Sequence, residues 1–372
     1  GRAAQHSATV VLAGVLGVGE VVRLVGSVIH PTIIPDTCNT LTGVSDPTRR
    51  TAEEPPPRRR SVRRRVTLGS TAAALACGLL VSACGTDSGS DAESGQSSGA
   101  QSGCTTTSTS GQRDANLIPI PPAAVTVTST GNQPQRVVGG APDRSTPQHS
   151  TLSTTSSVTA ADGTTEQTVD IPITATFHCT DNTDLEMTLG ASTSPDPTLN
   201  DQLKAARDAK AGVALGPGAA PVSLRLIPTK DSGSEARSAI EQSLVQAFQN
   251  SIPLPTEPIG VGATWRTERT ITAATTLTQT ITATLKAWDG NRVTIDFTTE
   301  ESPVNSVYAI PGSDTTLTIS RYSYTGSGTL VSDVTRGLPL SGSGTYTGAR
   351  ELVGADPANP LLQKIGFSYT WK

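Results

Sequence analysis

Apolar and polar side chains alternate with a period of two across residues 276–299, the pattern of half-buried antiparallel strands. Asp289-Gly290 interrupts this alternation as a turn. The apolar rows before and after the turn must face the same side, which requires an odd number of loop residues, so we predict a loop of residues 288–290. The predicted pairs are Leu285 with Val293, Ala283 with Ile295 and Ile281 with Phe297, and Leu277 and Ala287 complete the apolar row.

The same alternation predicts a second hairpin of residues 152–161 and 164–179 about Asp162-Gly163. Because both hairpins have the same layout, the domain could consist of two related halves. Further strands are predicted at residues 315–325, 328–334, 338–347 and 365–371, and the glycines that fit bulges or bends in a curved sheet are Gly326, Gly328, Gly342 and Gly344.

One segment, residues 234–250, has apolar residues at helical spacing, and Ser232 with Glu235 resembles a capping box at its start. The expected fold class of residues 115–372 is therefore mainly β (α+β). We predict a strongly curved antiparallel sheet with one long amphipathic helix across its concave face. A domain of this length can bury a sizeable core.

Residues 62–83 have the parts of a secretory signal: three arginines, a short apolar run and small residues before a cleavage site. The run is short for a membrane span. Its end, Val-Ser-Ala-Cys at residues 81–84, resembles the lipobox of bacterial lipoproteins. In that family the cysteine thiol is alkylated by a diacylglyceryl group and the peptide is cut just before it. The resemblance implies lipidation of Cys84 and a cell-membrane protein that is lipid-anchored on the extracytoplasmic face.

These signals divide the chain. Residues 1–61 lack methionine and include a Pro/Arg-rich run, so we expect a non-native extension of the reading frame or a disordered segment. Residues 84–114 are rich in Ser, Gly and Thr and predict a lipidated flexible tether with a reach of about 30 Å. Residues 115–372 form the expected β-rich extracytoplasmic domain.

Removal of the signal region leaves an acidic chain. Of the 28 Lys and Arg and 32 Asp and Glu, residues 1–65 carry 10 and 5 and residues 66–83 carry none, so the remainder has 18 and 27, a net charge of −9. This balance argues against nucleic acid, whose phosphates require basic contacts, and against a polybasic lipid-binding patch. The expected partners are the membrane, through the lipid anchor, and an apolar ligand.

Five cysteines occur, of which Cys38 and Cys77 are lost on processing. With Cys84 lipidated, Cys104 and Cys179 remain in an oxidising compartment. A disulfide between them would close a loop of 75 positions and stabilise the fold by about 4 kcal/mol. The alternative is two free thiols, with Cys104 in the tether and Cys179 buried.

The sharpest indication of an enzyme is Arg-Val-Val-Gly-Gly at residues 136–140, which resembles the activation site of trypsin-like serine proteases. His178-Cys179 resembles the segment around their catalytic histidine. The family's Gly-Asp-Ser-Gly-Gly motif is absent, and so is the cysteine expected some sixteen positions before Cys179. Without a nucleophile there is no acyl transfer, and we predict no catalytic residue.

Other sites are also not indicated. His178 and Cys179 are adjacent on a strand and point to opposite faces, and His149 is the only other histidine after residue 84, so we predict no metal site. No phosphate loop or dinucleotide motif occurs, and we predict no cofactor. Asp296 and Glu300 share one strand face and could be paired carboxylates, although such residues more often lie on a solvated face.

The most distinctive motif is Pro-Ile-Gly-Val-Gly-Ala-Thr-Trp at residues 258–265. We interpret Pro258, Gly260, Gly262 and Trp265 as a structural turn, with a binding loop as the alternative. Together with the lipobox and the Thr-rich strands, the motif resembles actinobacterial secreted lipoproteins of an uncharacterised family, over roughly residues 115–372. The resemblance implies no activity.

The tether, the aliphatic strand faces and the missing catalytic set favour a non-catalytic binding or carrier module for an apolar or amphiphilic ligand. Curved sheets closed by a helix can enclose such a ligand, which is an argument from fold analogy. The alternative is a structural or interaction protein of the envelope with a packed core, and a hydrolase is the third hypothesis. Whether the interior between sheet and helix is empty or packed distinguishes the first two hypotheses.

Overall fold

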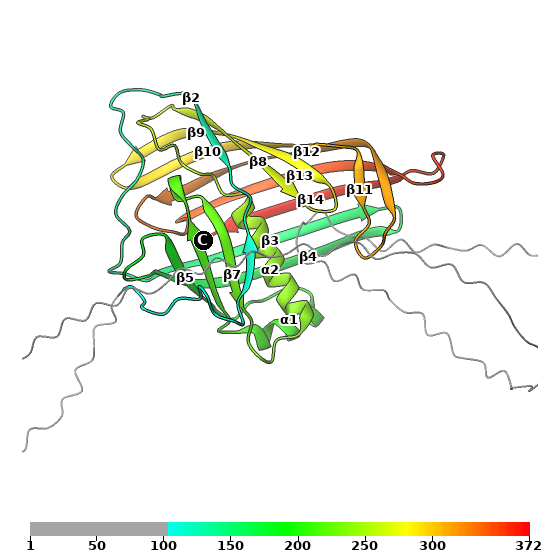
Figure 1. Ribbon diagram of the computed structural model, residues 1–372, viewed down its shortest axis with the longest axis horizontal. Helices are drawn as coiled ribbons and strands as arrows, with labels where there is room; N and C mark the ends of the chain where they lie inside the picture. The colour runs from blue at the N-terminus through cyan, green and yellow to red at the C-terminus, as the bar shows by residue number, and fades with distance from the viewer. Residues whose placement is uncertain (1–102) are drawn as a thin grey trace, which may run out of the picture. The chain divides into compact units, whose positions relative to one another are not determined.

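The computed structural model describes residues 103–372, and Cys84 with the signal region lies outside this part (Figure 1). All its named strands belong to one antiparallel fourteen-stranded sheet, so the mainly β class is confirmed. The strands are β1 Asn116–Pro119, β2 Ala124–Ser129, β3 Gln148–Ala160, β4 Gly163–Phe177, β5 Asp184–Leu189, β6 Lys210–Leu215, β7 Pro221–Ile227, β8 Thr264–Thr272, β9 Thr276–Asp289, β10 Arg292–Pro303, β11 Val307–Ala309, β12 Thr316–Asp333, β13 Ser341–Val353 and β14 Leu361–Trp371.

Two meanders make up the sheet. Strands β3 to β7 follow one another in space, as do β8, β9, β10, β12, β13 and β14, and the pairing of β3 with β14 joins the two. Strand β1 pairs with β7 at one edge, β2 pairs with β8 at the other, and β11 pairs only with β12. A relationship between the two meanders stays a prediction.

The two edges of the sheet are tied together by the chain. Strands β1 and β2 lie at opposite ends of the pairing order, yet only residues 120–123 separate them. The five Cα–Cα steps from Pro119 to Ala124 span at most about 18 Å. The edges of a flat sheet with this order would lie about 58 Å apart. The sheet must therefore curl. Figure 1 shows the consequence, because β5 and β7 stand steeply across the view whereas β12, β13 and β14 run along it.

The prediction of one long helix is wrong. Two α-helices, α1 Pro197–Leu203 and α2 Ser234–Gln249, and two single-turn 3-10 helices, η1 Lys204–Ala206 and η2 Pro217–Ala219, are all short. Helix α2 occupies the expected segment, but its 16 residues cover only about 24 Å. The capping box is also not formed: Gly233 is the N-cap, and Ser232 Oγ donates to Thr229 O at 2.8 Å.

Helix α2 lies against the inner face of the sheet. Thr154 Oγ1 on β3 hydrogen bonds with Ser243 Oγ at 2.8 Å, and Phe248 packs on Trp371 of β14 with ring centroids 6.3 Å apart. Every residue from 243 to 249 is buried. The C-terminal half of the helix is therefore covered on all sides, which a helix resting on an open sheet would not be.

The β9–β10 hairpin shows how the sheet keeps its apolar row inside. The predicted loop of residues 288–290 is wrong, because the strands close over residues 290–291. The extra residue that parity requires is Lys286, bulged between the pairs Ala287–Thr294 and Leu285–Ile295. As a result Ala287 is exposed while Leu285 remains buried.

The rest of the predicted register shifts with this bulge. Leu285 pairs with Ile295, whereas its predicted partner was Val293. Phe297 pairs with Ala283, whereas its predicted partner was Ile281. In the β3–β4 hairpin the turn comes one residue earlier than predicted, at residues 161–162. Alternate residues of β4 from Val169 to Phe177 are buried, in agreement with the alternation from which the hairpin was predicted.

The glycines of β12 and β13 make room for aromatic rings. A Cβ on Gly326 would lie 2.2 Å from the Tyr346 ring, and one on Gly348 would lie 2.7 Å from the Tyr324 ring. These two rings stack with centroids 6.0 Å apart, and Tyr346 also contacts Phe367 at 5.7 Å. Gly326 was predicted to mark a bulge or bend, but its role here, like that of Gly348, is to let a ring lie flat on the sheet backbone. The middle of the interior is consequently packed.

Replacement of Gly326 by alanine should destabilise the protein by about 2 kcal/mol or more, because the new methyl group must displace a buried ring. Urea unfolding measures the change. Gly139→Ala is the control, since a Cβ there meets no atom within 4 Å, and it should change stability by less than about 0.5 kcal/mol. Equal stability of Gly326→Ala and wild type would contradict the packed arrangement.

Candidate functional site

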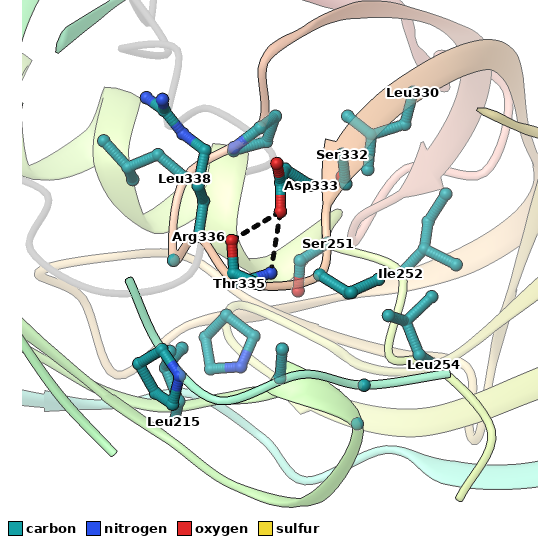
Figure 2. A pocket seen from close by; sticks show the side chains of 18 of the residues that line it. Leu215, Ser251, Ile252, Leu254, Leu330, Ser332, Asp333, Thr335, Arg336 and Leu338 are labelled. Atoms are coloured by element: carbon teal, nitrogen blue, oxygen red, sulfur yellow. Dashed lines mark hydrogen bonds between the residues drawn. The ribbon is translucent and has the colours of Figure 1, made fainter. Parts of the chain in front are cut away.

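A cavity of about 390 Å³ lies where α2 ends (Figure 2). Its floor is apolar and comes from strands of both meanders and from the helix. Five chain segments form its rim: residues 138–142, residues 182–183 of the β4–β5 loop, the β6–β7 connection, the α2–β8 loop and the β12–β13 loop. The large floor residues are Phe177, Phe248, Ile295, Leu330, Tyr369 and Trp371.

The polar residues of the lining include one carboxylate and one guanidinium, and they are Asn182, Thr183, Asn250, Ser251, Ser332, Asp333, Thr335 and Arg336. Asp333 Oδ1 accepts hydrogen bonds from Thr335 N at 2.9 Å and Thr335 Oγ1 at 2.6 Å, as Figure 2 shows. Ser251 Oγ is buried without a hydrogen-bond partner. The lining of this cavity contains no His, Cys, Lys or Glu. Because its one carboxylate is already engaged, the arrangement offers apolar contact and a few hydrogen bonds, and no nucleophile with a base beside it.

The motif at residues 258–265 holds one rim segment in place. Ile259 and Arg136 exchange backbone hydrogen bonds of 3.0 Å in both directions. Gly260 N donates to Thr130 O at 2.8 Å, and a Cβ on Gly260 would lie 1.8 Å from Asn132 O, so only glycine fits. The chain on its way to residues 138–142 is therefore laid against this motif.

The other end of the motif fixes the start of β8. Gly262 adopts φ +86°, where a side chain is strained, and Gly262 N donates to Leu285 O at 2.7 Å. Trp265 is fully buried, and its Nε1 donates to Pro253 O at 3.0 Å. Pro258, Gly260, Gly262 and Trp265 do not line the cavity. Their contacts are those of a turn that positions its neighbours.

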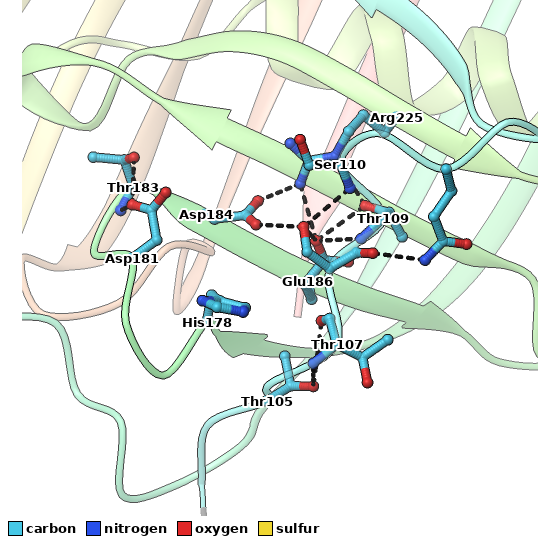
Figure 3. Close-up of polar contacts among 12 residues, drawn as sticks. Thr105, Thr107, Thr109, Ser110, His178, Asp181, Thr183, Asp184, Glu186 and Arg225 are labelled. Atoms are coloured by element: carbon cyan, nitrogen blue, oxygen red, sulfur yellow. Dashed lines mark hydrogen bonds and ion pairs between the residues drawn. The ribbon is translucent and has the colours of Figure 1, made fainter. Parts of the chain in front are cut away.

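The N-terminal described segment, residues 103–115, is attached to the outer face of β5 and β7 (Figure 3). A disulfide joins Cys104 and Cys179, whose Cα atoms are 5.1 Å apart. Thr105 N donates to Phe177 O at 3.1 Å, and Cys179 N donates to Thr105 O at 2.8 Å. The last part of the segment that the sequence assigned to the tether is thus bound to the folded body.

A buried charge cluster holds this segment further along. Glu186 Oε1 accepts from Thr109 N at 2.8 Å and from Ser108 Oγ at 3.1 Å, and Arg225 contacts both Glu186 and Asp184. Figure 3 shows Asp184, Glu186 and Arg225 converging beside Thr109. All partners of this carboxylate belong to the chain itself, so the cluster has a structural role.

The remaining candidate residues do not assemble. Asp296 Oδ1 accepts from Thr329 Oγ1 at 2.7 Å on the outer face, and Glu300 is exposed on the same face. His178 Nε2 lies 3.3 Å from Thr106 O, and His149 Nδ1 lies 3.2 Å from Thr174 Oγ1 on another strand. Neither the carboxylate pair nor the histidines meet at the cavity.

Within residues 103–372 no three His, Cys, Asp or Glu side chains are arranged to hold a metal ion. In the same part of the chain, no helix combines the length and apolar character needed to cross a membrane.

No family model matches the chain, and no curated protein matches it. The resemblance to an uncharacterised lipoprotein family therefore stays a prediction, and the function must be argued from the geometry.

Sequence reasoning proposed a cavity between sheet and helix but did not identify the residues that line it. Residues 136–140 were singled out only for their protease-like pattern, and in the structure Val138, Gly139 and Gly140 line the cavity. A Gly-Gly pair beside a buried valine in a stretch without strand pattern was the available signal. Nothing in the sequence showed that it would meet the end of α2.

A row of buried polar groups crosses the inner face of β8, β9, β10 and β12 beside the α2–β8 loop. Gln279 Nε2 donates to Glu301 Oε1 at 3.0 Å, and Tyr322 OH donates to Glu301 Oε2 at 3.1 Å. Arg269 on β8 donates to Ser251 O at 2.9 Å, and burial lowers the pKa of Arg269 to about 10. Burial also raises the pKa of Glu301, an effect that its two hydrogen bonds oppose.

The pH dependence of the protein's stability should reflect the raised pKa of Glu301. Because its folded-state pKa lies above the usual 4.5, the folded state binds more protons, so this group's contribution to stability falls as pH rises through a window that starts near 4.5. Denaturant unfolding from pH 4 to pH 7 should show wild type losing stability relative to Glu301→Gln. Glu300→Gln, on the exposed face of the same strand, is the control. Parallel curves for wild type and Glu301→Gln would contradict this account.

Proposed function

We propose that the protein is a membrane-anchored extracytoplasmic lipoprotein, lipidated at Cys84, whose body binds or carries a small apolar or amphiphilic ligand without catalysis. The observation that carries the proposal is the cavity at the end of α2, with its apolar floor and polar rim. Its 390 Å³ lies within the range of small-molecule sites. A cavity with an apolar floor gains binding free energy chiefly from removing apolar ligand surface from water.

The size of the cavity limits the ligand. Because 390 Å³ lies near the lower end of the roughly 300–1,000 Å³ of small-molecule sites, the ligand is a small molecule such as a single short acyl chain. The packed aromatic rings of Tyr324, Tyr346 and Phe367 leave no continuation of the cavity into the middle of the interior.

The attachment of the N-terminal segment supports a role at a membrane. Thr105 bonds to Phe177, and Phe177 lines the cavity. A lipid on Cys84 would be connected through residues 85–103 to a point beside the cavity. A ligand leaving the membrane surface would then have a short distance to travel.

A recognition role for the Thr-rich outer face is less well supported. Several of its hydroxyl groups already bond across strands, such as Thr155 with Thr168 at 2.9 Å and Thr159 with Thr164 at 2.8 Å. Such cross-strand pairs stabilise the sheet and leave fewer free donors for a partner. The packed middle of the interior fits the envelope interaction protein, and we favour the ligand carrier because an apolar-floored cavity remains at the end of α2.

Lipidation is tested in a bacterial host that modifies lipoproteins. Cells expressing the full chain and fed an alkyne-tagged fatty acid should yield a labelled protein in the membrane fraction, because the acyl chains hold it there. Cys84→Ser should remove the label and release the protein from the membrane. Label that persists in Cys84→Ser, or no label on the wild type, would contradict the proposed anchor.

Ligand binding is tested with the full chain carrying Cys84→Ser and with 11-bromoundecan-1-ol, whose bromine quenches the fluorescence of Trp371 in the cavity. Ser332→Phe places a ring among the lining residues and should weaken binding at least tenfold. Ser327→Phe, on the exposed face of the same strand, should leave affinity unchanged. The carrier proposal fails if no quenching occurs, or if both variants bind as well as wild type.

A further inference from the structure

One wall of the cavity differs from the others in how it is held. Residues 137–142 form no helix or strand, and their backbone groups make no hydrogen bond to any other described backbone group. The segment is fixed at each end instead. Arg136 pairs with Ile259 before it, and Asp143 N donates to Thr335 O at 2.9 Å after it.

The anchor before the segment is firm. Besides its backbone pairing, the Arg136 guanidinium lies 4.0 Å from the centroid of the Trp288 ring and donates to Gly290 O at 3.3 Å. A cation over an indole face and a backbone hydrogen bond hold this residue on the β9–β10 hairpin. Movement of the segment must therefore take place beyond Arg136.

The other rim segments are held along their length. The α2–β8 loop is bonded through Ser251 O, Pro253 O and Leu254 N, the last donating to Gly218 O at 2.9 Å. In the β12–β13 loop, Gly337 N and Leu338 N both donate to Gln148 Oε1 at 3.1 Å. Residues 137–142 are thus the rim segment with the fewest hydrogen bonds to break, the property expected of the part that opens first.

The side chains of the segment suit a closing element. Val138 is 6% exposed and lines the cavity, whereas its neighbour Val137 is 54% exposed. Gly139, next to Val138, has no Cβ to restrict its backbone. Gly140 lies against the opposite rim, since a Cβ there would be 2.9 Å from Thr335 Cγ2.

We propose that residues 137–142 are a gate that opens and closes the cavity, with Val138 as its latch and Arg136 and Asp143 as its fixed ends. Opening lifts Val138 out of the cavity and parts Gly140 from Thr335, while the sheet and α2 stay in place. This inference rests on the proposed ligand-binding function and adds to it the route by which the ligand enters and leaves.

The test uses the full chain with Cys84→Ser and stopped-flow quenching by 11-bromoundecan-1-ol. Gly140→Cys with Thr335→Cys places two thiols at the contact between gate and rim. When this pair is oxidised, association and dissociation should both slow at least tenfold, and mild reduction should restore them. Cys84→Ser alone, given the same reductant, controls for effects on the Cys104–Cys179 disulfide.

A second pair of variants tests the latch without a crosslink. Val138→Ala should speed dissociation several-fold, because the closed gate loses its buried contact. Val137→Ala, whose side chain is exposed, should leave both rates unchanged.

The outcomes separate the gate from the carrier function. Rates in the oxidised double-cysteine protein within twofold of the reduced protein, or equal rates in Val138→Ala and Val137→Ala, would overturn the gate while ligand binding stands. The absence of quenching in every protein, oxidised or reduced, would overturn the gate and the proposed function together.

Discussion

The short connection between β1 and β2 constrains everything else in the described body. Two strands at opposite edges of the sheet are four residues apart in the chain, so the sheet can satisfy its pairing order only by curling. Curling creates an inner face that must be filled, because the alternating strands present one apolar row each. Helix α2 and the aromatic side chains fill it, and the cavity remains where the helix stops.

The filling of the interior follows from residue size at facing positions. In the middle, glycines on β12 and β13 let Tyr324 and Tyr346 lie on the backbone, so ring packs on ring without a gap. Toward the end of α2, the floor is made by Phe248, Ile295 and Trp371 at the ends of strands and helix, and the space above them is bounded by loops. Loops pack against each other less closely than paired strands do, so a cavity is left between them.

The motif at residues 258–265 positions the rim segment of residues 136–143. Gly260 lets the chain at Asn132 approach within the distance a methyl group would occupy, and the pairing of Ile259 with Arg136 follows directly. The structural turn thus sets the position of the rim segment without contacting the cavity. The disulfide between Cys104 and Cys179 holds the start of the N-terminal segment, residues 103–115, near Phe177. Phe177 lines the wall of the cavity opposite the rim segment.

Local pattern alone indicated the β3–β4 and β9–β10 hairpins, most of β12 to β14 and the place of α2, because the alternation of apolar residues is a property of neighbouring positions. Parity also required one extra residue in the β9–β10 hairpin, but only the folded sheet placed it at Lys286 in a bulge, since a turn and a bulge satisfy parity equally well. The joining of the two meanders, the depth of α2 and the cavity depend on contacts between residues far apart in the chain. Those contacts are decided by how side chains of different sizes pack, which no short stretch of sequence contains.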